Sequence, residues 1–184
     1  MASPEQIYRV YAELHANAQT VRDFQVAAGE RVSGTVQLLL AGDRARLLAR
    51  WGDEMTELCG VLDGSHADPY ILEATQVFYW ASLYAVTAGV SWEELHFVDL
   101  RQQAAAARIE SVDRLRSQAQ RLVDLGPERA GVQKPFLLWW IADGFYRAAT
   151  PMERQWTLEQ LMEYDLQEMK KRPYLAPILD RVEA

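Results

Sequence analysis

A single carboxylate stands in a long apolar stretch of this sequence. Between Pro69 and Trp92 the only formally charged side chain is Glu73, and most of its neighbours are aliphatic or aromatic. An isolated charge is costly to remove from water, so this carboxylate must become neutral, form an ion pair or bind a cation. Because no Lys or Arg lies in the same stretch, we expect the partner of Glu73 to be a metal ion.

Three further polar residues share the spacing that this site would need. Glu54 and Glu57 lie three residues apart, as do Glu73 and Gln76, and this spacing places each pair on one face of a helix. The turn at 63–68 between the two helices is short, so we expect an antiparallel helical hairpin with both pairs near its mouth. Oxygen ligands of this kind suit Mg²⁺, with Mn²⁺ as a second possibility.

The elements that would position these residues are helical throughout. Apolar residues recur at helical spacing, and capping residues, Gly and Pro separate the periods. The run VQLLL fits either a helix or a short buried strand. We predict an all-α helical bundle, with the acidic helical hairpin and extra C-terminal helices. The first expected helix begins near Pro4. The other expected helices cover about 17–28, 43–62, 69–88, 91–125, 136–146 and 157–171.

Composition limits the class of protein. A length of 184 residues with 49% hydrophobic residues predicts one domain with a substantial core. A net charge of −7 argues against nucleic acid or an anionic membrane as a partner. The single cysteine, Cys59, excludes an intrachain disulfide, and no secretory signal is evident, so we expect a cytoplasmic protein. The uncharged run 74–90 is short for a membrane span and contains polar residues, which favours a buried core helix.

Residues 43–100 resemble the MazG-like all-α nucleoside triphosphate pyrophosphohydrolases. The family shows two acidic pairs on consecutive helices, followed by an apolar helix and a glycine, as in DEMTE and ILEATQVFYWASLYAVTAGVSWEEL here. The resemblance implies a core over about 1–108 and a helical extension over about 109–184. It implies a Mg²⁺-dependent enzyme that cleaves a nucleoside triphosphate or related phosphoanhydride to a monophosphate and pyrophosphate.

The resemblance also implies roles for individual residues. Glu54, Glu57 and Glu73 would be metal ligands, and Gln76 takes the fourth position, where the family has aspartate. Asp53, with Glu54, would orient water for catalysis. A second set would hold substrate phosphate, and it consists of Arg101 and Arg108. The family further implies a nucleotide as substrate and a homo-oligomer, with a dimer favoured.

Two other interpretations stay open. Gln76 brings no charge, so the chain could be a catalytically impaired nucleotide-binding or helical interaction protein. Alternatively, the acidic residues are merely solvated on the surface of a helical oligomer. For single residues the simpler interpretations are a surface-loop role for His66, a buried structural thiol for Cys59, and core packing for the aromatic residues.

Overall fold

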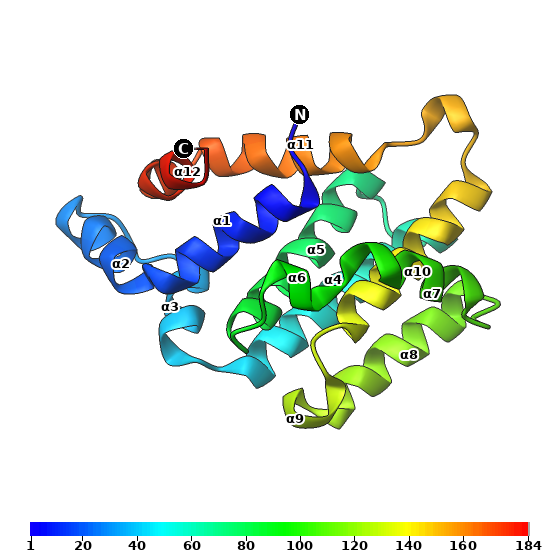
Figure 1. Cartoon of the computed structure of the whole chain (residues 1–184). Helices are drawn as coiled ribbons and strands as arrows, with labels where there is room; N and C mark the ends of the chain where they lie inside the picture. Colours follow the sequence, from blue (N-terminus) through cyan, green and yellow to red (C-terminus); the bar gives the residue numbers. More distant parts are fainter. Residues whose placement is uncertain (184) are drawn as a thin grey trace.

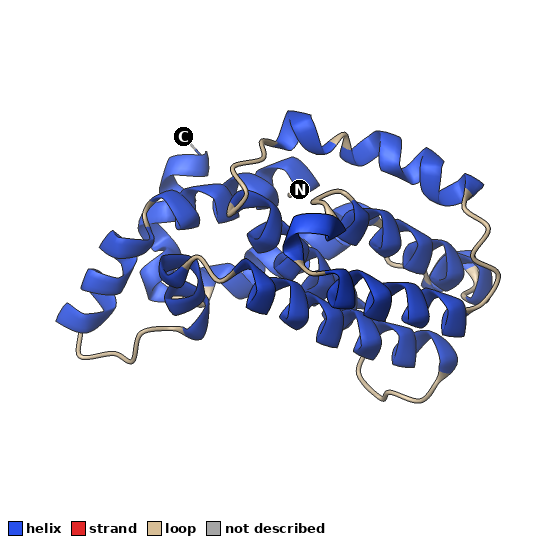
Figure 2. Cartoon of the chain, turned by 90° about the horizontal axis from the view of Figure 1, so that it is seen from below, coloured by secondary structure: helices blue, strands red, loops and turns tan. Residues whose placement is uncertain are grey.

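The computed structural model describes residues 1–183, and all regular structure in that range is helical (Figure 2). The prediction of an all-α fold is confirmed. The helices are α1 (Pro4–Ala16), α2 (Ala18–Ala27), α3 (Gly34–Ala41), α4 (Arg44–Asp63), α5 (Tyr70–Val86), α6 (Trp92–Leu95), α7 (Phe97–Ala106), α8 (Val112–Leu125), α9 (Pro127–Ala130), α10 (Lys134–Ala149), α11 (Leu158–Lys170) and α12 (Ala176–Glu183), with 3₁₀ turns at Met152–Arg154 and Pro173–Leu175.

The acidic hairpin consists of α4 and α5, which pack against each other over much of their length. Asp43 begins α4 as its N-cap, because its carboxylate accepts a hydrogen bond from the backbone N–H of Arg46 at 3.0 Å. Gly64 ends α4 in a left-handed conformation with φ of 81°, which glycine adopts without a steric penalty. Pro69 is the N-cap of α5, so the turn has the short length that the sequence predicts.

Helix α5 lies at the centre of the molecule. It contacts α4, α10, α1 and α11, and fourteen of its residues are buried, which explains why its sequence carries one charge. The rings of Phe78, Phe97, Phe136 and Trp139 meet edge-on or tilted in this core. The indole N–H of Trp139 donates to the Ala74 carbonyl at 2.8 Å. No helix within residues 1–183 is both long enough and apolar enough to cross a membrane.

The predicted helix over 91–125 is wrong as one element. A capping box begins α6, with Ser91 and Glu94 bonded to each other's backbone, but the chain turns at His96, which has φ of 51°. It turns again at Ala107, and Ser111 caps a new helix, α8. The physical reason is packing: the break at His96 lets α7 begin at Phe97, whose ring meets the rings of the core. Sequence periodicity cannot show this break, because it depends on contacts with segments that are distant in the sequence.

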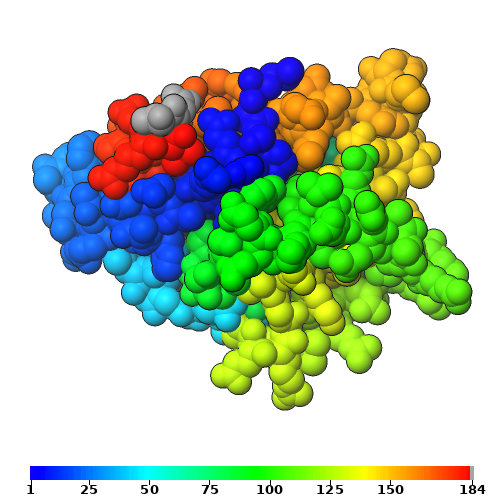
Figure 3. Space-filling model, in the orientation of Figure 1, coloured from blue at the N-terminus to red at the C-terminus, as the bar shows by residue number. Residues whose placement is uncertain are grey.

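The two ends of the chain lie together. Helix α1 contacts both α11 and α12, and these helices run along one side of the molecule, in blue and in orange to red (Figures 1 and 3). The segment after residue 109 contributes to the core itself, because α8 packs on α4, and α10 packs on α4, α5 and α7. The ambiguous run at 36–40 is helical and belongs to α3, which Ser33 caps.

Candidate metal site

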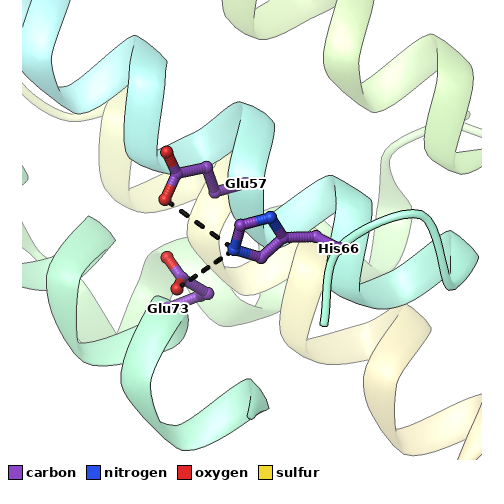
Figure 4. A group of neighbouring side chains, drawn as sticks. All are labelled: Glu57, His66 and Glu73. Atoms are coloured by element: carbon purple, nitrogen blue, oxygen red, sulfur yellow. Dashed lines mark ion pairs between the residues drawn. The ribbon is translucent and has the colours of Figure 1, made fainter. Parts of the chain in front are cut away.

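Three side chains converge at the mouth of the hairpin. Glu57 comes from α4, Glu73 from α5 and His66 from the turn between them, and the three residues' potential ligand atoms all lie within 4.8 Å of one another. His66 Nε2 lies 3.6 Å from Glu73 Oε1 and 3.9 Å from Glu57 Oε2. Figure 4 shows the imidazole nitrogen directed toward both carboxylates. Two oxygen donors and one nitrogen donor from three chain segments form a small cage.

The turn holds His66 against α4 by close backbone packing. The backbone N–H of His66 donates to the Gly60 carbonyl at 3.0 Å. A Cβ atom added to Gly60 would lie 2.7 Å from Cβ of His66, so the missing side chain allows this approach. The ring nitrogen also lies 3.1 Å from Asp68 Oδ2 in the same turn. Because several contacts fix the turn, the imidazole stands beside the two carboxylates.

The carboxylate of Glu73 is buried and only partly satisfied. The residue is 2% exposed, and its Oε2 atom is buried without a hydrogen-bond partner. Burial raises the pKa of Glu73, and the negative charge of Glu57 raises it further, while His66 lowers it. An unpaired oxygen in such a place has a substantial energetic cost. A divalent cation would satisfy this atom, and the oxygen and imidazole donors around it suit Mn²⁺ or a similar ion.

Glu54 stands beside the cage. It is 7% exposed, and its Oε1 lies 3.2 Å from a guanidinium nitrogen of Arg50. Burial raises the pKa of Glu54 to about 7; the charges of Glu57 and Glu73 also raise it, and Arg50 lowers it. Asp53 is exposed and lies 3.5 Å from the same guanidinium. The structure therefore brings Glu54, Glu57 and Glu73 together and leaves Asp53 at the solvent edge.

The remaining predicted site residues lie elsewhere. Gln76 is one turn along α5 from Glu73, and its side chain lines a separate cavity between α5 and α11. Arg101 lies over the ring of Trp140, 5.3 Å from its centroid, and lines a cavity between α7 and α10. Arg108 is exposed in the loop before α8. Neither arginine forms an ion pair or hydrogen bond with the acidic residues in the described part of the chain.

Two features of the site were missed from the sequence. The simpler interpretation of His66 as a surface-loop residue overlooks one usable signal, its place in a short turn between the Glu54 and Glu57 pair and Glu73. The second feature is a hollow beside the hairpin, lined by Arg46, Arg50 and Trp80 among others. The guanidinium of Arg50 lies 5.2 Å from the centroid of the Trp80 ring. Residues 46, 50, 54 and 57 recur at helical spacing, so one face of α4 carries cations at one end and carboxylates at the other.

Comparison of the chain with protein-family models, with curated proteins and with solved structures found no match.

Proposed function

We propose that the protein is a divalent-metal-dependent hydrolase of phosphoanhydrides, which cleaves a nucleoside triphosphate or a related compound to a monophosphate and pyrophosphate. The observation that carries the proposal is the unpartnered, buried oxygen of Glu73 beside Glu57 and His66. Burying this carboxylate beside other acidic residues is energetically costly. A hairpin whose acidic residues were only solvated would not bury it.

Different residues would bind the metal ion, accept a proton and bind the substrate. Glu57 and Glu73, with His66, would hold the ion, which when bound would neutralise charge on phosphate oxygens and lower the pKa of water. Glu54, turned toward Arg50 at the edge of the cage, would accept a proton from the attacking water. The guanidinium groups of Arg50 and Arg46 line the adjoining hollow and would bind the anionic end of a substrate. We propose this arrangement in place of Arg101 and Arg108 as the phosphate-binding pair.

The donor set also favours one class of ion. Mg²⁺ prefers oxygen ligands in octahedral geometry, whereas an imidazole nitrogen suits first-row transition metals better. Because His66 lies 3.6 Å from Glu73 and 3.9 Å from Glu57, we expect Mn²⁺ to bind more tightly than Mg²⁺. Mg²⁺ would still support activity through the carboxylates.

The test is pyrophosphate release from a panel of nucleoside triphosphates, with Mg²⁺ or Mn²⁺ and with EDTA. Glu57→Gln and Glu73→Gln should each lower kcat/KM by at least about a hundredfold, which corresponds to about 2.7 kcal/mol of transition-state stabilisation. Glu128→Gln changes an exposed carboxylate of α9 in the same way and should have no effect. Full activity in Glu73→Gln, or metal-independent release, would refute the proposal.

One observation favours the alternative of a nucleotide-binding protein without turnover. Gln76 is uncharged and lines another cavity, so the cage lacks the fourth carboxylate that the resemblance implies. In that case nucleotides would raise the melting temperature with metal present, but no pyrophosphate would be released.

A further inference from the structure

An apolar trough follows the surface of α10 between α7 and α8. Helix α10 packs on both of these helices. One hollow opens between α10 and α7 and another between α10 and α8, and both have Ala107, Ile109 and Ile141 in their walls. Because they share these three residues, the hollows adjoin each other. We call the combined surface the trough.

The floor of the trough is apolar, although a surface helix ordinarily presents polar residues to water. Gly144 and Ala148 of α10 are exposed here, and Leu137 and Phe145 are half-buried. One stripe of α10 lines the trough at helical spacing and carries a single charge; it consists of Lys134, Leu137, Ile141, Gly144, Phe145 and Ala148. At a rise of about 1.5 Å per residue the stripe is about 21 Å long, which matches about four turns of a second helix.

Cations without partners stand around this floor. Arg121 of α8 and Lys134 of α10 line one hollow, and Arg101 of α7 lines the other; we call these three residues the rim cations. Within residues 1–183 none of them forms an ion pair or a hydrogen bond, although Arg101 lies over a tryptophan ring. Among the described residues that line the trough, Asp143 is the only acidic one, and Arg147 pairs with it at 2.6 Å. The trough thus has a positive surplus in a chain of net charge −7.

An acidic amphipathic helix matches these features. Its apolar stripe would pack on the floor, as in other cases where a helix binds in a groove, and the small residues Ala104, Ala105 and Gly144 leave room for its backbone. Its carboxylates would meet the rim cations. Charges more than about 8 Å apart are largely screened at physiological salt, so such a partner responds to this local surplus more than to the net charge. A second copy of the chain fits less well, because a two-fold contact would place the rim cations against each other.

We propose that the trough is a docking site for an acidic amphipathic helix of another protein, which packs its apolar stripe on α10 and pairs its carboxylates with the rim cations. None of the residues that line the trough belongs to the metal cage or to the hollow at Arg46 and Arg50. The docking site is therefore independent of the proposed hydrolase.

The test is fluorescence anisotropy with a labelled peptide of about 15 residues, the length of the stripe, titrated with the full chain. The peptide has leucine at helical spacing on one face and glutamate on its flanks. One comparison peptide has the same composition in scrambled order, and another has lysine in place of glutamate. We expect the acidic amphipathic peptide to bind at least about tenfold more tightly than either. Its affinity should fall as salt rises from about 0.1 M to about 1 M, because the Debye length shortens from about 10 Å to about 3 Å.

Two variants test the rim and the floor. Arg121→Glu/Lys134→Glu reverses two exposed rim cations, and it should weaken the acidic peptide at least about tenfold and strengthen the lysine peptide. Arg22→Glu/Arg31→Glu makes the same change of charge at exposed positions in and after α2, and it should leave the affinity within about twofold. Gly144→Gln places a longer side chain in the trough at a position with open space around it, and it should weaken the peptide at least about tenfold.

Equal binding of the three peptides would overturn the proposal, and so would unchanged affinity in both trough variants. Two other occupants are tested in parallel. Binding to phosphatidylserine vesicles that Arg121→Glu/Lys134→Glu abolishes, without binding of the acidic peptide, would assign the trough to a membrane surface. Self-association in sedimentation velocity that Gly144→Gln abolishes, again without peptide binding, would assign it to a second copy of the chain. Either result would refute docking of an acidic helix from another protein.

Discussion

Glu54→Gln should stabilise the metal-free protein at alkaline pH. The carboxyl of Glu54 has its pKa raised from 4.5 to about 7, so folding favours its protonated form. The stability associated with this proton is fully present below pH 4.5 and is lost as the pH rises through 7. The difference corresponds to at most about 3.4 kcal/mol. Because Arg50 beside it is 46% exposed and water screens the site, we expect a gain of about 2 kcal/mol at pH 8.

The assay is urea denaturation with EDTA at pH 5 and pH 8. Wild type and Glu54→Gln should have nearly equal free energies of unfolding at pH 5 and should separate at pH 8. Asp53→Asn is the control, because it removes a neighbouring carboxylate that is 64% exposed and pairs with the same arginine. That variant should change the stability by less than about 0.5 kcal/mol at either pH. If Glu54→Gln destabilised the protein at pH 8, Glu54 would be a stabilising partner of Arg50 and the electrostatic reasoning would be refuted.

Three other predictions test the turn, the donor set and the core. Gly60→Ala should unfold at a lower urea concentration and bind Mn²⁺ more weakly, since its Cβ would lie 2.7 Å from Cβ of His66. Gly144→Ala is the control at a helical site with open space around it, and its free energy of unfolding should rise by up to about 1 kcal/mol. His66→Gln should lower Mn²⁺ affinity at least about tenfold in calorimetry, with a smaller loss for Mg²⁺; equal losses would argue against nitrogen coordination. Leu58→Ala, at a fully buried position, should cost about 2–5 kcal/mol in urea denaturation.

The helical class and the acidic hairpin could be predicted because their signals are local. Asp43 at the start of α4, the turn after Gly64 and the capping box at Ser91 each act within a few residues, and the structure has all three. The break at His96 could not be predicted in this way. It depends on where Phe97 meets rings from α5 and α10, which are distant in sequence.

In the candidate site, too, local features could be predicted and long-range contacts could not. Spacing alone placed Glu54, Glu57 and Glu73 near each other, because helical periodicity and a short turn fix their relative positions. The same reasoning cannot predict which neighbouring helix each residue of α5 faces. Gln76 lies at the same spacing as a ligand pair, yet it lines the cavity that α11 closes, and α11 lies about 80 residues farther along the chain. No local pattern identifies Asp165 as its neighbour across that cavity.

The turn of the hairpin supplies the polar neighbour of Glu73. A carboxylate buried against two helices needs a partner that reaches it without disturbing either helix, and the chain supplies one from the turn that joins them. Gly60 and Gly64 allow the turn to fold back on α4, which brings the imidazole of His66 to 3.6 Å from Glu73. One carboxylate oxygen thereby lies beside the imidazole, while the other remains without a hydrogen-bond partner. The same compact turn that completes the fold thus leaves one coordination position of a buried acid open, which is the condition for binding a cation there.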